Sequence, residues 1–143
     1  ARMAKAIDAA IYTHLISDQT TGSAFDLVSG RVSASYGDPG DDFPLITFEQ
    51  VADEVTKGFG GTVMMHRAEY EISVFGRWED GLAELGTIAD KVIELFGTPV
   101  NGTGTNFDRI QMECSSGASI ARDDELIVAT IRVTARGAQT GGL

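Results

Sequence analysis

Hydrophobic side chains recur at intervals of three and four residues near the start of the chain, which is the spacing of one face of a helix. The pattern predicts a helix over residues 3–17, with a buried face made of Met3, Ile7, Ala10, Ile11, His14 and Leu15. Residues 18–30 are rich in Ser, Thr, Asp and Gly, and they predict a loop. Three apolar side chains inside this loop indicate that it packs onto the core: Phe25, Leu27 and Val28.

Two short extended segments are predicted next. Residues 31–36 predict a short strand, and the Gly, Asp and Pro residues at positions 37–42 predict a turn. A second strand is predicted over residues 45–51. Pro44 has no amide donor, so it suits the first residue of a strand or the edge of a sheet.

The longest predicted strand returns after a glycine-rich break at residues 57–61, so the two strands form a hairpin. Apolar and polar side chains alternate along it. Ala68, Tyr70, Ile72 and Val74 point to one side, and the other side carries Arg67, Glu69, Glu71 and Ser73. One dry face and one wet face are typical of an antiparallel sheet with helices on one side.

A second helix is predicted after Asp80, which is a plausible N-cap, and Gly97 and Pro99 supply the stop signal. The helix carries the most regular apolar stripe of the chain, formed by Leu82, Leu85, Ile88, Ala89, Val92, Ile93 and Phe96.

The C-terminal third predicts more strands. Residues 101–106 predict a loop, and residues 107–120 predict a strand of mixed polarity. The acidic turn at residues 122–125 precedes a last alternating strand, which places Ile127, Ala129, Ile131, Val133 and Ala135 on one side. The small and polar residues 137–143 predict a frayed tail.

Together these elements predict an α+β fold. We expect a mainly antiparallel, mixed sheet of about four to five strands, with two principal helices packed on one face and a protruding hairpin. The length of 143 residues is that of one domain, so residues 1–143 are expected to form a single domain with its own core.

The charge of the chain limits its possible partners. Eleven basic residues stand against 21 acidic ones, which gives a formal net charge of −10. This balance disfavours a dedicated nucleic-acid-binding protein, because phosphate contacts need a basic surface. It favours either simple solubility or an acidic surface that DNA passes without adhering. No apolar run approaches the length of a membrane span, so no membrane partner is expected.

The candidate catalytic and metal-ligating residues are few. His14 lies on an apolar helix face and is interpreted as a packed histidine. With two histidines and one cysteine, Cys114, the chain does not match a zinc site. A Cys–His dyad requires that the fold bring His66 beside Cys114. We therefore expect no catalytic residue, no metal, no cofactor and no enzyme activity. The single cysteine fits a reducing compartment.

Two clusters have open interpretations. Phe59, Met64 and Met65 flank the glycine-rich turn, where they either fold back onto the core or contact a neighbouring subunit. The loop residues Asp38 and Asp41, with Asp42, do not have the spacing of a calcium loop, and a solvated acidic loop is the simpler interpretation.

The order of these segments resembles the tail-completion, or tail-terminator, proteins of long-tailed bacteriophages, prophages and gene-transfer agents. The likeness covers about residues 3–137 and departs from the family in a longer hairpin at residues 49–65 and in the acidic loop around Asp41. The segments that carry it are the N-terminal helix, Gly30-Arg31-Val32, Phe43-Pro44-Leu45-Ile46-Thr47-Phe48, Glu69-Tyr70-Glu71-Ile72-Ser73-Val74-Phe75, the helix from Leu82 to Phe96, and Arg122-Asp123-Asp124-Glu125 before the last strand.

The resemblance implies a structural virion protein that forms a ring of about six copies. Such a ring caps the tail tube and joins the tail to the head or neck, so its partners are the tail tube protein and a connector protein. It is located at the head–tail junction of the virion, after assembly in the host cytoplasm. DNA passes through the lumen without specific binding, and we hypothesise that the lumen is lined by some of the residues Asp38, Asp41, Asp42, Glu49, Asp53 and Glu54.

Two alternatives to this interpretation remain. A head-completion or neck adaptor protein has similar size and charge. A small α+β hydrolase or ligand-binding domain is an alternative of another class, and it requires polar groups that converge in a pocket.

Overall fold

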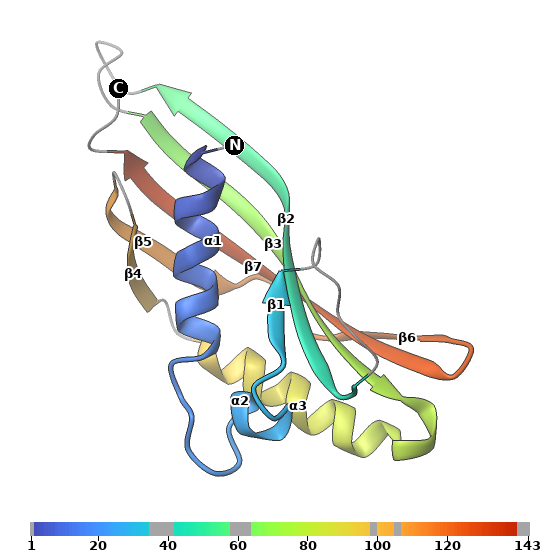
Figure 1. The fold of residues 1–143 in the computed structure, drawn as a ribbon. Helices are drawn as coiled ribbons and strands as arrows, with labels where there is room; N and C mark the ends of the chain where they lie inside the picture. The colour runs from blue at the N-terminus through green and yellow to red at the C-terminus, as the bar shows by residue number, and fades with distance from the viewer. Residues whose placement is uncertain (1, 35–41, 58–63, 98–99, 105–106, 140–143) are drawn as a thin grey trace.

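The computed structural model describes residues 2–34, 42–57, 64–97, 100–104 and 107–139 (Figure 1). Their elements are, in chain order, α1 (Arg2–Leu15), α2 (Ala24–Leu27), β1 (Val32–Ala34), β2 (Leu45–Lys57), β3 (Met64–Arg77), the 3-10 helix η2 (Trp78–Asp80), α3 (Leu82–Leu95), β4 (Val100–Gly104), β5 (Phe107–Cys114), β6 (Ser119–Asp123) and β7 (Leu126–Gln139).

The strands form one mixed sheet of seven strands in the order β1-β2-β3-β7-β5-β4, with β6 paired to the first half of β7. Only β1 and β2 run parallel, and all other neighbours are antiparallel. The predicted number of strands was therefore too low. Residues 107–120 hold parts of two strands instead of one, and the loop predicted over residues 101–106 contains most of β4.

The core lies between one face of the sheet and the helices. In Figure 1, α1 crosses in front of the sheet and α3 lies across its lower end, with α2 beside it. The alternating positions of β3 and β7 that were predicted to be apolar are all buried, and so is the apolar stripe of α3 from Leu85 to Phe96, apart from Ile93, which is partly buried. The residues of the predicted loop that were expected to pack inward do so: Val28 is buried, and Phe25 and Leu27 are partly buried against the core.

Polar contacts also connect the helices to the sheet. The hydroxyl of buried Tyr70 on β3 donates a hydrogen bond to the carboxylate of Asp8 on α1. His14 Nε2 lies 2.6 Å from the carbonyl oxygen of Leu95, and its ring packs edge-on against Phe96 with 4.7 Å between centroids. His14 is thus a packed histidine between the ends of α1 and α3, as the sequence indicated.

Other local predictions were also wrong, and the loop predicted over residues 18–30 contains the short helix α2. Asp80 is not the N-cap of α3: it belongs to η2, and Gly81, whose φ of 91° suits glycine, precedes the helix. The tail does not fray from residue 137, because residues 137–139 continue β7 and pair with β3. The predicted protruding hairpin is described only in its arms, β2 and β3, and β7 pairs with β3 as far as Met64 with Gln139; its tip at residues 58–63 lies outside the described residues.

Replacement of Ile72 by Ala should destabilise the protein by about 2–5 kcal/mol, because the fully buried side chain leaves a cavity in the core. Replacement of the adjacent Ser73 by Ala, on the opposite face of the same strand, should change the free energy of unfolding by no more than about 0.5 kcal/mol. Urea unfolding followed by circular dichroism measures both. Equal effects would contradict the assignment of the two faces.

Candidate functional site: the uncovered face of the sheet

The sheet has a second face on which no helix of the described chain packs, and it is called the uncovered face here (Figure 1). Its most polar part is a charged band, defined as Glu49 and Glu54 of β2, Arg67, Glu69 and Glu71 of β3, Arg132 and Arg136 of β7, and Glu113 of β5. The alternation seen in the sequence placed the polar residues of β3 on this face correctly.

The register of the strands sets like charges opposite one another within the band. Glu49 pairs with Glu71 across β2 and β3, and Arg67 pairs with Arg136 across β3 and β7. Directly opposed like charges destabilise a sheet. Each like-charged pair also faces an opposite charge on a neighbouring strand. Arg132 of β7 is opposite Glu71, and Glu54 of β2 is opposite Arg67.

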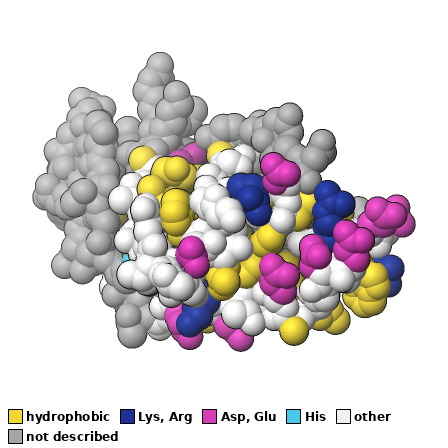
Figure 2. Space-filling model, turned by 60° about the horizontal axis from the view of Figure 1, so that its bottom comes forward, with side chains coloured by type: hydrophobic (Ala, Val, Ile, Leu, Met, Phe, Trp, Pro, Cys, Tyr) yellow, Lys and Arg dark blue, Asp and Glu magenta, His cyan; other side chains and the backbone are white. Residues whose placement is uncertain are grey.

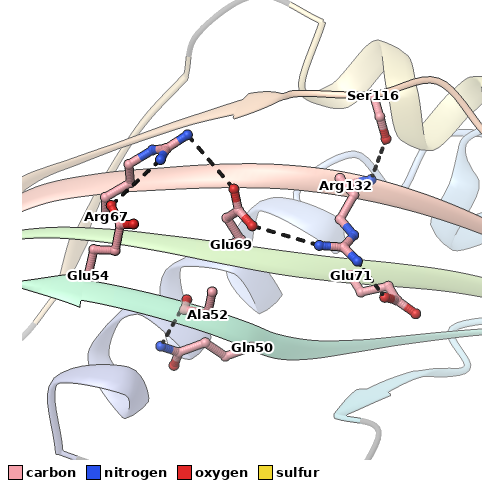
Figure 3. A network of polar contacts seen from close by, with 8 residues as sticks. All are labelled: Gln50, Ala52, Glu54, Arg67, Glu69, Glu71, Ser116 and Arg132. Atoms are coloured by element: carbon pink, nitrogen blue, oxygen red, sulfur yellow. Dashed lines mark hydrogen bonds and ion pairs between the residues drawn. The ribbon is translucent and has the colours of Figure 1, made fainter.

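Five residues of the band form a connected set of ion pairs, namely Glu54, Arg67, Glu69, Glu71 and Arg132 (Figure 3). Arg67 lies 3.7 Å from Glu54 and 3.8 Å from Glu69. Arg132 lies 3.7 Å from the other carboxylate oxygen of Glu69 and 3.4 Å from Glu71. Glu69 therefore lies between two guanidinium groups. These distances are those of ion pairs rather than of short hydrogen bonds.

A second contact lies further along β7. Arg136 donates a hydrogen bond of 3.2 Å to Glu113 on β5. Thr134, which is opposite both Glu69 and Glu113, is only 3% exposed although it belongs to the uncovered face. The long charged side chains beside it cover its surface with their aliphatic stems.

The next rows of the same face carry no charge. The register aligns Thr47 of β2 with Ser73 of β3, Ser73 with Thr130 of β7, and Thr130 with Ser119 of β6. Beyond that row, the same face carries an apolar row formed by Leu45, Phe75, Val128 and Ala121. The uncovered face thus consists of a charge-compensated band, a row of hydroxyl groups and an apolar row.

The acidic residues proposed for a lumen do not form one surface. Glu49 and Glu54 share the uncovered face. Asp53 is opposite buried Ala68, so it points to the helix side, where its carboxylate lies 3.4 Å from His66 Nδ1. The cause is a β-bulge between Gln50 and Ala52, which inserts one residue and reverses the alternation of side chains after it. Asp42 is exposed ahead of β2, and Asp38 and Asp41 lie outside the described residues.

The proposed interface residues lie at the hairpin end of the sheet. Met65 is exposed on the uncovered face, and Val55, opposite His66, is exposed on the other face. Phe59 and the side chain of Met64 lie outside the described residues. Met65 and Val55 lie on opposite faces, so each is a separate candidate for a contact at this end of the sheet.

The opposite end of the sheet carries a surface that the sequence did not reveal. The Arg122 guanidinium lies 3.9 Å from the ring centroid of exposed Trp78, and Ile120, two residues away on β6, is also exposed. A groove of about 900 Å³ runs beside them and is lined by Phe43, Arg77, Trp78, Glu79, Arg122, Asp124, Glu125 and Leu126. Figure 2 brings this lower end forward and shows acidic, basic and hydrophobic side chains interspersed. The sequence feature that could have indicated this surface is Trp78, a large apolar residue that belongs to no periodic apolar pattern.

The described residues do not assemble the chemistry considered for an enzyme. Cys114 is opposite Val133 on β7 whereas His66 is opposite Gly137, so the two are separated along the sheet and form no dyad. No group of three or more potential metal ligands occurs among the described residues. No helix in this part of the chain is long and apolar enough to cross a membrane.

The Thr20 hydroxyl and amide lower the pKa of Asp18, which is fully exposed beside a surface pocket.

The ion pairs of the charged band should contribute little to folding, because exposed pairs typically contribute about 0–1 kcal/mol. A double-mutant cycle with Glu69→Gln and Arg132→Gln should give a coupling energy below about 1 kcal/mol that decreases as salt is added. Urea unfolding of the four proteins measures it. A coupling well above about 2 kcal/mol, insensitive to salt, would make the band a stabilising element.

The comparisons with known proteins agree with this architecture. No protein-family model matches the chain, and no curated protein matches it. Among solved structures, the chain resembles a chain from the virion of a native gene transfer agent (GTA) particle, with a TM-score of 0.73 and 17% identical residues. The match covers 94% of this chain and 96% of that chain. Two chains that match over nearly their whole lengths at this identity share a fold.

Proposed function

We propose that the chain is a structural virion protein of a phage-like particle and that it terminates the tail tube as a ring joining the tail to the head or neck. The observation that carries the proposal is the likeness in fold to a chain of a gene-transfer-agent virion over 94% of this chain. The order of sequence segments that resembles tail-terminator proteins supports the same role.

The two faces of the sheet suggest how a subunit is oriented in the ring. The uncovered face carries the charged band and the row of hydroxyl groups, whereas α1 and α3 occupy the other face. We propose that the uncovered face is turned to the lumen and the helices outward, so that DNA meets a hydrophilic wall. Glu49 and Glu54 remain lumen candidates, and Asp53 is replaced in that role by Glu69, Glu71 and Glu113.

The ends of the sheet then serve as contact surfaces. Met65 and Val55 lie at the hairpin end, and Trp78, Ile120 and Arg122 lie at the other end. We propose the hairpin end as the contact between neighbouring copies. The Trp78 end is proposed to contact the tail tube protein or the connector protein, because Trp and Arg are enriched among residues that dominate binding energy.

The position of the chain in the particle tests the role. In cells that produce the particle but cannot build heads, purified tails should carry the chain at one end, detected by antibody labelling in electron micrographs. Heads made without tails should lack it. The reverse distribution would favour a head-completion or neck adaptor, and absence from both would remove a structural role.

Replacement of Met65 by Glu should reduce ring formation at least tenfold, since a carboxylate would be buried in the contact between copies. The matched control is Leu82→Glu, because Leu82 is 45% exposed against 46% for Met65 and lies at the start of α3, away from the hairpin. Mass measurement at several concentrations, with and without purified tail tubes, gives the fraction assembled. Equal assembly of the two variants would exclude Met65 from the interface.

A further inference from the structure

The charged band presents an electrostatic problem for a surface that faces DNA. It contains three arginines whose side chains are 46%, 46% and 47% exposed: Arg67, Arg132 and Arg136. A guanidinium group binds phosphate with two donors at once and is weakly hydrated. Free arginines at these positions would therefore retard a passing duplex, which presents one negative charge about every 1.7 Å along its axis.

Each of these arginines is held by a carboxylate of the same face. Arg67 and Arg132 each lie between two glutamates at 3.4–3.8 Å, and Glu69 is shared between them. Arg136 is hydrogen-bonded to Glu113 at 3.2 Å. The glutamates come from three different strands, so the arrangement depends on the register of the sheet and not on local sequence.

These short distances determine the electric field that acts on an approaching phosphate. The Debye length at physiological salt is about 8 Å, so a carboxylate within 4 Å of a guanidinium cancels much of its field at the distance of an approaching phosphate. Arg136 also has one donor fewer to offer, because its guanidinium group is hydrogen-bonded to Glu113. With five glutamates and three arginines, the band carries a net charge of −2. It is therefore weakly repulsive rather than strongly acidic.

We propose that Glu69, Glu71 and Glu113 mask the arginines of the uncovered face from DNA phosphate, so that this face tolerates duplex DNA without binding it. The inference rests on the proposed function for its biological meaning, because the duplex is the molecule that passes the ring. The charged band is thus a masked phosphate-binding surface, and removal of its masking carboxylates exposes that activity.

The test is made on the isolated protein with a short fluorescent DNA duplex of arbitrary sequence. The triple variant E69Q/E71Q/E113Q keeps the shapes of the side chains and removes three carboxylates, which leaves two glutamates beside three arginines. It should bind the duplex at least about tenfold more tightly than the unchanged protein at low salt. Arg67 keeps Glu54 at 3.7 Å in this variant, whereas Arg132 and Arg136 lose these carboxylate partners. If Arg132 and Arg136 each neutralise one phosphate, log affinity should fall against log salt with a slope near about −1.8.

A control variant separates this local effect from the total charge. D80N/E84Q/D90N removes three exposed carboxylates on or beside α3, and both triple variants change the formal net charge from −10 to −7. The control should not bind the duplex. Adding R67Q/R132Q/R136Q to the first triple variant should abolish the binding that it gained. Circular dichroism melts confirm that all variants are folded.

Two outcomes overturn the inference. If the folded E69Q/E71Q/E113Q protein does not bind the duplex, the arginines are not masked phosphate ligands. If the control variant binds equally well, the total charge and not the band controls DNA binding. Neither outcome affects the location of the chain in purified tails, so failure of the inference is distinguishable from failure of the proposed function.

Discussion

The antiparallel pairing of β3 with β7 is the constraint on which the rest of the structure depends. The two longest strands, each of 14 residues, are in register along their full lengths in the middle of the sheet. This register places Tyr70 beside Val133 and Ile72 beside Ile131 on the helix side. A slip of one residue would turn every apolar side chain of one strand to the polar face, so burial of the core fixes the register strongly.

The same pairing determines the arrangement of charge on the other face. Because β3 contacts β2 on one side and β7 on the other, Glu71 is opposite both Glu49 and Arg132. The ion pairs therefore follow from a register that the hydrophobic core selects. They do not need to stabilise the fold in order to persist, and exposed pairs of this kind contribute little. The network extends over three strands and contributes little to folding. It is therefore available for contact with other molecules.

Much of the fold could be predicted from periodicity, because both principal helices and the two faces of β3 and β7 have a regular apolar pattern. Features that depend on pairing between distant segments could not. The bulge at Val51 has no signal in the alternation of β2, and it alone sends Asp53 to the helix side. The division of residues 107–120 between β5 and β6 follows from both pairing with different halves of β7. The charged residues could be identified in the sequence, but the ion pairs that they form could be predicted only with knowledge of the strand order.

The distribution of charge changes the meaning of the net charge of −10. That value first suggested a lumen made strongly repulsive by carboxylates of the acidic loop and β2. The structure instead gives the charged band a net charge of −2, so the remaining net charge of −8 lies elsewhere on the chain. A wall of paired charges and hydroxyl groups neither attracts phosphate nor repels it strongly, and it remains hydrated. If the proposed ring admits and releases a polyanion, a nearly neutral polar wall minimises the energy change along the path, since deep wells and high barriers both slow passage.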